Sequence, residues 1–313
     1  MDNIVKTIFL VSSWILTFST SFIILKGIHN YLHTPYKRKI CSSKVRILFL
    51  PALYSLEASL SISFPSWSPL FIMFRGLCEA LVIIAFLQYL VIMLDDVHLP
   101  KKTKHLIPCS CCFSEWEMKK IIISILQYVL VMFIVMPITL LSWAGNRYLH
   151  PSKFSPKAAY IYCTIIRNIS QMLAIYGLIM LYKILYSEIQ KKIYKPILKL
   201  ACIKLIVFFT FWQSILISGL VYKHYVDSEN DVYYNSGILS MEMLLFAFLH
   251  LYAFSGQESE YNIQESQISF YEIVCDFVNP SKILNECKCY YQMAHVPNKR
   301  ENLITQSEDY DEL

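Results

Sequence analysis

Seven long apolar segments alternate with polar loops along the 313 residues of the chain. They cover residues 7–25, 45–64, 70–94, 121–143, 158–182, 200–222 and 236–254. A helix rises about 1.5 Å per residue, so about 20 apolar residues cross a hydrocarbon core about 30 Å thick. The pattern therefore predicts an all-α fold, a bundle of seven transmembrane helices.

Polar residues inside segment 200–222 indicate that the helices pack against one another. Lys204 lies near one end of this segment and Gln213 near its middle. A lysine near a helix end extends its ammonium group to the membrane surface. A glutamine at mid-membrane needs a partner helix or a water-filled cavity. The other six segments supply such partners.

Composition excludes a soluble globular protein. Hydrophobic residues make up 56% of the chain and charged residues only 16%, and 22 Tyr, 19 Phe and 5 Trp are typical of a membrane protein with aromatic interfaces.

Most of the ten cysteines fall in apolar segments or basic loops, which favours free thiols. The first apolar segment follows the N-terminus without a small-residue cleavage site, so we expect a signal anchor.

Basic residues concentrate in the loops after the first, third and fifth segments. The loops on the other side carry fewer cations, and three acids, Asp227, Glu229 and Asp231, offset them. Basic loops stay in the cytosol. The sequence therefore predicts an N-terminus outside the cell or in a lumen and a cytosolic C-terminus, and a miscounted segment would reverse this orientation.

Three regions follow from the pattern: a seven-span membrane domain over residues 1–256, an amphipathic juxtamembrane segment over 257–290, and a disordered cytosolic tail over 291–313. Within the second region, residues 268–278 have apolar positions at helical spacing, typical of a helix that lies on a membrane.

An ordered set of short motifs runs through residues 45–280. It includes Tyr54-Ser55, Phe64-Pro65, Glu79-Ala80, Leu126-Gln127-Tyr128, Asn168-Ile169-Ser170, Pro196-Ile197-Leu198-Lys199, Phe211-Trp212-Gln213 and Ala247-Phe248-Leu249-His250. In order and spacing, the set resembles the organic solute transporter subunit alpha and transmembrane protein 184 family. One departure is Met136 before Pro137, because relatives often have an arginine in this region.

The resemblance implies a function as well as a fold. The alpha-subunit branch is a facilitative carrier of steroid conjugates and bile-acid-like amphipaths and works with a small single-span partner. The other branch lies in endolysosomal or vacuolar membranes, and some fungal members are linked to autophagy. We therefore expect a transporter of amphipathic organic or lipid-like solutes in an endomembrane or the plasma membrane, as a homodimer or with a single-span partner. The alternatives are a vacuolar or endolysosomal adaptor and a seven-helix receptor.

A first candidate site combines Glu57, Arg75 and Glu79. The short turn over residues 65–69 folds the second segment back on the third, which places Glu57 at about the depth of Arg75. Glu79 lies one helical turn further along the same face as Arg75. These charges form either a site for an ion or a substrate head group, or a structural ion cluster that locks the hairpin.

A second candidate site draws on the last three segments. We expect a polar track with aromatic walls, suited to an amphipathic solute, between the fifth, sixth and seventh helices. Hydrogen bonding between helices is the alternative role for these polar groups. The candidate residues are Asn168, Lys204, Trp212, Gln213, Glu242 and His250, with Arg167 beside them.

Cys109, Cys111 and Cys112 lie beside several lysines just before the fourth segment. Cysteines next to a membrane and to cations favour S-acylation; inert thiols are the alternative, and the spacing of the nearby histidines does not suit zinc. The chain shows no catalytic motif, so we expect no enzyme, no cofactor, no metal and no nucleic-acid partner.

The C-terminus offers a candidate docking motif. Tyr310 and Leu313 are separated by two residues and preceded by acids, a pattern similar to the motif that binds ubiquitin-like autophagy modifiers. Such a strand adds to an exposed sheet edge, and the two side chains fill pockets. The alternatives are an acidic tail that keeps the end soluble and an ER-retrieval signal. The predicted cytosolic position argues against the latter.

Overall fold

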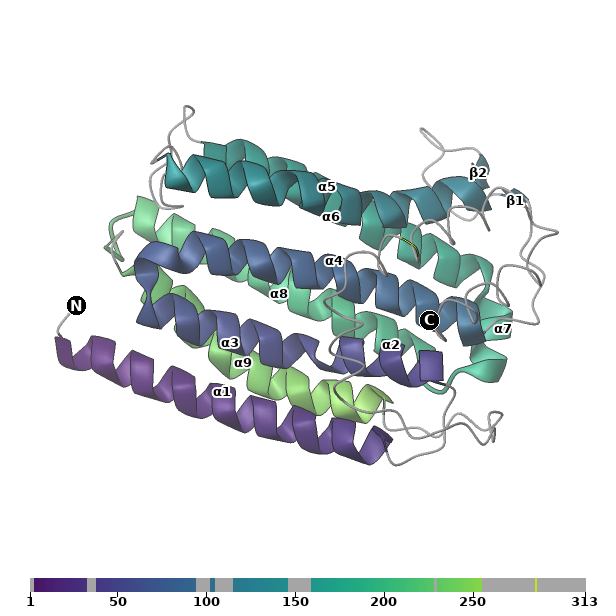
Figure 1. Ribbon diagram of the computed structural model, residues 1–313, viewed down its shortest axis with the longest axis horizontal. Helices are drawn as coiled ribbons and strands as arrows, with labels where there is room; N and C mark the ends of the chain where they lie inside the picture. Colours follow the sequence, from purple (N-terminus) through teal and green to yellow (C-terminus); the bar gives the residue numbers. More distant parts are fainter. Residues whose placement is uncertain are drawn as a thin grey trace.

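The computed structural model describes residues 3–32, 38–93, 102–104, 115–145, 159–227 and 230–254, together with residue 285. Long helices dominate this part of the chain (Figure 1). They are α1 (Asn3–Leu32), α2 (Arg38–Leu48), α3 (Leu50–Ser63), α4 (Ser68–Met93), α5 (Met118–Ala144), α6 (Ala159–Ile184), α7 (Tyr186–Lys192), α8 (Pro196–Tyr222) and α9 (Asp231–Phe254).

The prediction of seven transmembrane helices is confirmed: seven stretches within the described residues are long and apolar enough to cross a membrane. They are Asn3–Asn30, Ile40–Ser63, Pro65–Met93, Lys120–Ala144, Ile161–Ile184, Pro196–Tyr222 and Asp231–Phe254. Successive spans run in opposite directions, so the start of α1 and the end of α9 lie at opposite ends of the bundle (Figure 1).

The second span is two helices rather than one, and it begins at Ile40 instead of residue 45. α2 ends at Leu48 and α3 begins at Leu50, with Phe49 between them. Pro51 lies in the first turn of α3 and has no N–H to donate to the preceding turn. The helix therefore breaks where a continuous helix would need that hydrogen bond.

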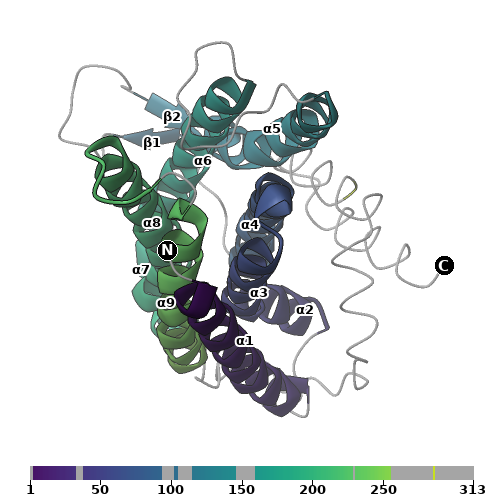
Figure 2. The same cartoon turned by 90° about the vertical axis from the view of Figure 1, so that its left-hand side faces the viewer.

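α4 occupies the middle of the bundle and packs against α2, α3 and α5. α5 and α6 form a closely packed pair on one side, while α1, α3 and α9 pack against one another on the other (Figure 2). α8 packs mainly against α9. Among the described helices, α4 is therefore the one that contacts both groups extensively.

Hydroxyl groups connect α1, α3 and α9. The Ser13 hydroxyl lies 2.6 Å from Ser59 and 2.9 Å from Ser240. Thr17 lies 2.7 Å from Ser59 and 2.8 Å from Ser55. Small residues let membrane helices approach closely, and their hydroxyls then bond across the interface. We refer to these five residues as the hydroxyl cluster.

One element was not expected from the sequence. β1 (Lys102–Lys104) and β2 (Glu115–Glu117) form an antiparallel pair just before α5, with Thr103 opposite Trp116. The two strands are only three residues each, so the fold remains all-α in class.

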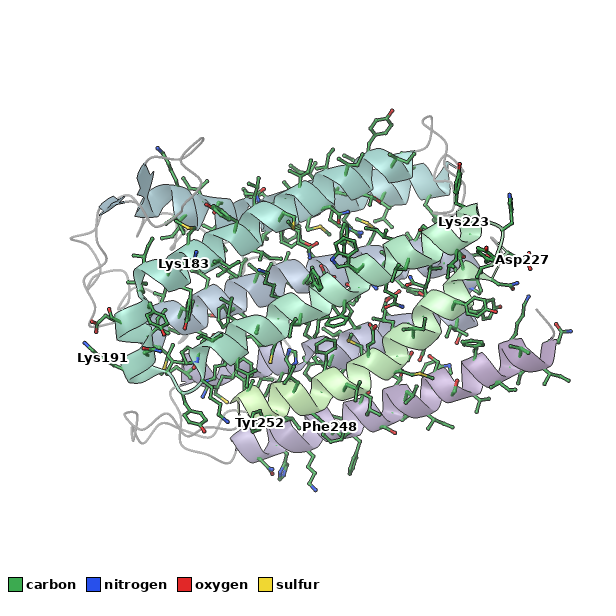
Figure 3. All side chains as sticks on the ribbon, turned by 180° about the vertical axis from the view of Figure 1, so that it is seen from behind. Lys183, Lys191, Lys223, Asp227, Phe248 and Tyr252 are labelled. Carbon is green, nitrogen blue, oxygen red and sulfur yellow. The ribbon has the colours of Figure 1, made fainter. Side chains whose placement is uncertain are left out.

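Side chains are distributed as a membrane environment requires. Ile4, Ile8, Ile15, Phe18 and Phe22 form an exposed apolar stripe along α1. Exposed charged side chains instead lie at the ends of the bundle, where Lys183 and Lys191 mark one end and Lys223 and Asp227 the other (Figure 3). Exposed apolar flanks with polar ends are typical of helices in lipid.

Candidate functional site

An ion pair joins the two helices of the α3–α4 hairpin. Arg75 Nη1 lies 2.7 Å from Glu57 Oε2, and Arg75 Nε lies 3.6 Å from Glu79 Oε1. Glu57 Oε1 also accepts a hydrogen bond from Ser61 at 2.8 Å. The turn over Pro65–Trp67 brings these groups to one depth. The structure thus brings together the first set of candidate residues.

Neutral donors from three helices surround the carboxylate of Glu79. Tyr54 on α3 donates to Oε1, while Tyr128 on α5 and Gln171 on α6 donate to Oε2 at 3.3 and 2.6 Å. The Arg75 guanidinium also lies 5.0 Å from the centre of the Tyr54 ring. Each carboxylate oxygen of Glu57 and Glu79 therefore has a donor, as a buried charge requires. We refer to Tyr54, Glu57, Ser61, Arg75, Glu79, Tyr128 and Gln171 as the Arg75 cluster.

Sequence reasoning did not identify Tyr54, Tyr128 and Gln171 as members of this cluster. Tyr54 and Tyr128 are fully buried, and Gln171 is 7% exposed. Gln171 and Arg167 lie one turn apart on α6, on the same face, and this spacing of two polar residues in an apolar span is the signal in the sequence. The tyrosines give no such signal, because tyrosines in membrane spans are also common at the membrane–water interface, where they need no buried partner.

Arg167 lies against the backbone of α4 beside the Arg75 cluster. A Cβ atom on Gly76 would stand 3.5 Å from Arg167 Cδ and 3.8 Å from Arg167 Nη1, so the arginine side chain lies within contact distance of α4. Arg167 is half-buried and has no hydrogen bond or ion pair in the described residues. The two arginines, Arg75 and Arg167, and the two glutamates, Glu57 and Glu79, carry a net formal charge of zero. Arg167 therefore lacks hydrogen-bond acceptors rather than a counter-charge.

A second polar contact lies between α8 and α9. Gln213 Nε2 donates to the backbone oxygen of Asn235 at 2.6 Å, while Gln213 Oε1 is buried and has no hydrogen-bond partner in the structure. Glu242 lies on the same helix as Asn235 and is half-buried, and its Oε2 is also buried without a partner. The α8–α9 interface thus contains two acceptor oxygens without donors.

The structure divides the second set of candidate residues instead of gathering it in one cavity. Lys204 and Trp212 are exposed and lie on the side of α8 away from α9. Asn168 is half-buried and lies about 100° around α6 from Arg167. His250 is fully buried, with Nδ1 2.9 Å from the Phe246 carbonyl oxygen and its ring stacked on Phe254. Packing that joins α8 to α9 and α6 to α5 produces this division.

Two lysines that the sequence places in basic loops are fully buried in helices. Lys199, in the first turns of α8, donates to the Tyr89 hydroxyl at 3.0 Å and lies 5.5 Å from the centre of the Phe254 ring. Lys44 on α2 lies 5.8 Å from the centre of the Tyr89 ring. Aromatic faces attract cations. We refer to Lys44, Tyr89, Lys199 and Phe254 as the buried lysine cluster, which lies at the α7 end of the bundle.

Lys195 joins the start of α8 to the end of α9 at the same end of the bundle. Its ammonium lies 3.7 Å from the centre of the Tyr252 ring and 4.8 Å from that of Tyr194. A hydrogen bond to Tyr252 raises the pKa of Lys195 above its usual range. Lys195 therefore remains charged at neutral pH and connects the two helices.

Some candidate residues cannot be placed. The acylation candidates Cys109, Cys111 and Cys112 lie outside the described residues, as do Tyr310 and Leu313 of the tail. The same holds for the predicted juxtamembrane helix over 268–278. Within the part of the chain that the structure describes, no group of three or more His, Cys, Asp or Glu side chains could hold a metal ion.

Seven apolar spans, two of them joined by a buried ion pair, define a multi-pass integral membrane protein. The family model of the organic solute transporter Ostalpha matches residues 5–261, and the chain belongs to this family. No solved structure matches the chain.

Two relatives come from fungi and amoebae. The chain is 31% identical over 273 residues to the vacuole membrane protein HFL1 of Saccharomyces cerevisiae, an alignment that covers 78% of this chain and 60% of the relative. It is 29% identical over 242 residues to a transmembrane protein 184 homologue of Dictyostelium discoideum, covering 71% and 47%. The chain thus spans about half the length of the curated relatives that it matches. Both matches agree with an integral protein of an endomembrane or the plasma membrane.

Proposed function

We propose that the protein transports amphipathic organic solutes, steroid-like or lipid-like in body, with an oxygen-rich charged head. Its membership in the Ostalpha family supports transport as the activity. The proposed solute class rests on one observation. The guanidinium of Arg167 is half-buried inside a span and has no hydrogen-bond acceptor among the described residues. Arginine presents five N–H donors in a planar fork that suits carboxylate, sulfate or phosphate oxygens.

The surroundings of Arg167 fit this head group. Glu57 and Glu79 already accept from other donors, so they do not compete for Arg167. A bound head group would thus supply the missing acceptors, while the body of the solute lies among apolar side chains of the spans.

Liposome flux measurements test the proposal. Purified protein should catalyse saturable uptake of a radiolabelled sulfated steroid. Arg167→Gln should lower the initial rate about tenfold or more, because a hydrogen bond to a charged group contributes about 1.5–3 kcal/mol and 1.4 kcal/mol is a factor of ten. Lys183→Gln is the matched control, because Lys183 is an exposed cation on the same helix.

Equal flux through the wild type and Arg167→Gln would remove Arg167 from the solute path. No saturable uptake of any amphipath by folded wild-type protein would contradict transport itself. An adaptor, the alternative from the sequence, would instead keep its function when only its tail is fused to an unrelated membrane anchor.

A further inference from the structure

Glu242 differs from the other two carboxylates deep in the spans. Each oxygen of Glu57 and Glu79 accepts from an arginine, a hydroxyl or an amide. Glu242 has no hydrogen bond or ion pair in the described residues, and its Oε2 is shielded from solvent. A half-buried carboxylate without a donor is costly in a membrane.

The contacts of two neighbouring residues on α9 show in which direction Glu242 faces. Glu242 shares one helical face with Asn235, seven residues before it, and Phe246, four residues after it. Both of these contact α8: Asn235 accepts from Gln213, and the Phe246 ring centre lies 5.8 Å from that of Phe209. Glu242, between them, therefore faces α8 as well.

Gln213 is the polar side chain that α8 presents at this interface. It is 8% exposed, and its Oε1 has no donor. Gln213 Oε1 and Glu242 Oε2 are therefore two buried acceptors on adjoining helices, and neither has a hydrogen-bond donor in the described residues. A proton on the Glu242 carboxyl group would make that group a donor and remove its charge.

Among the described residues of the helices packed on α9, no cation pairs with Glu242. From α8, Thr210 donates to its own helix and Lys204 is exposed on the opposite side. On α9 itself, His250 lies two turns away and faces the Phe246 carbonyl oxygen, and Asp231 lies three turns away at the helix start.

On the other helices packed on α9, charged groups contact other partners. From α1, Lys6 lies over the Tyr233 ring at 5.4 Å, near the opposite end of the helix from His250. From α3, the hydroxyl cluster reaches Ser240, and Glu57 pairs with Arg75. From α2, Lys44 lies at the buried lysine cluster. An added proton is therefore the simplest way to neutralise Glu242.

We propose that Glu242 is a proton-binding site and that its protonation is linked to solute movement. A proton from water adds to a carboxylate oxygen, and the resulting O–H group donates a hydrogen bond to the amide oxygen of Gln213. It returns to water when α8 and α9 separate and the carboxylate becomes hydrated. A buried carboxyl group is least costly when it carries its proton, so the closed and open arrangements of the interface differ in their proton affinity. The transport half of this inference rests on the proposed function.

Infrared difference spectroscopy tests proton binding without any solute. Wild-type protein in lipid should show a carbonyl band of a buried carboxylic acid that disappears from acidic to alkaline buffer. Glu242→Gln should lose this band, whereas Glu242→Asp should retain a titrating band and show that the site tolerates substitution. Glu188→Gln should keep the wild-type band, because Glu188 pairs with Lys191 at the surface of α7. Identical spectra for wild type and Glu242→Gln would overturn the proposal.

Flux measurements test the link to transport. Uptake of the sulfated steroid by the wild type and by Glu188→Gln should change severalfold with pH, and this dependence should be lost in Glu242→Gln. An unchanged pH dependence in Glu242→Gln would overturn the linkage. If folded wild-type protein transports nothing, the proposed function fails while the infrared band still decides proton binding.

Discussion

Gln171 on α6 donates a hydrogen bond from Nε2 to Glu79 Oε2 on α4 across 2.6 Å. This bond reaches the centre of the bundle from a helix that packs mainly on α5. It places a neutral donor, rather than a second arginine, on a carboxylate deep in the membrane. Arg167, one turn away on the same face, makes no hydrogen bond to the described residues.

Gln171→Leu should destabilise the protein in detergent by about 1–3 kcal/mol, because the substitution leaves a buried charged acceptor with fewer donors. Thermal unfolding followed by size-exclusion fluorescence measures the loss. Gln190→Leu is the control, since Gln190 is exposed and bonds only Tyr186 on its own short helix. Equal unfolding temperatures for wild type and Gln171→Leu would contradict the role of this bond.

Arg75→Leu should lower expression and stability, because removing one partner of a buried pair typically costs about 3–5 kcal/mol. Adding Glu57→Gln should restore part of the loss, since Glu57 then carries no unpaired charge. Adding Glu79→Gln should restore less, because Glu79 also accepts from Tyr54, Tyr128 and Gln171. If neither double variant is more stable than Arg75→Leu, the ion pair is not what stabilises the hairpin.

Gly177→Ala should separate α5 from α6. A Cβ on Gly177 would stand 3.1 Å from the Ile121 backbone oxygen and 2.9 Å from Ile125 Cγ1, and it would also collide with Ser124 Oγ. Overpacking of this kind costs about 1–3 kcal/mol, measurable as a lower unfolding temperature. Gly219→Ala is the control and should be tolerated, because a Cβ there meets no atom within 4 Å.

Ser59→Ala should cost only about 0.6–2 kcal/mol, within the range for hydrogen bonds between membrane helices. Ser59 bonds both Ser13 and Thr17, but Ser13 keeps Ser240 and Thr17 keeps Ser55. Ser19→Ala, which removes a bond within α1 at an exposed site, should have no effect. A loss well above this range would show that the hydroxyl cluster acts as a cooperative unit.

Lys199→Met and Lys204→Met make a matched pair on α8. Lys199 is fully buried and donates to Tyr89, so its loss should destabilise the protein by about 1.5–3 kcal/mol. Lys204 is exposed, and its substitution should leave the unfolding temperature unchanged. Equal effects of the two substitutions would contradict a structural role for the buried lysine cluster.

The sequence by itself determined the number of spans and the proximity of Glu57, Arg75 and Glu79. Both depend on features that do not need distant contacts: segments of about 20 apolar residues cross a bilayer in any bundle, and a turn of a few residues forces two helices to lie side by side.

Only the tertiary structure decided which face of each helix meets another helix. Lys204 and Gln213 lie on one apolar helix, yet one is exposed and the other buried. Lys199 resembles a loop lysine in sequence, yet Tyr89 of α4 and Phe254 of α9 enclose it. The physical reason is that a membrane helix is apolar on all sides, because lipid and protein interior are similarly apolar. The apolar composition therefore predicts that a segment spans the membrane, but not which of its faces contacts other helices. That face is determined by close packing and by individual hydrogen bonds.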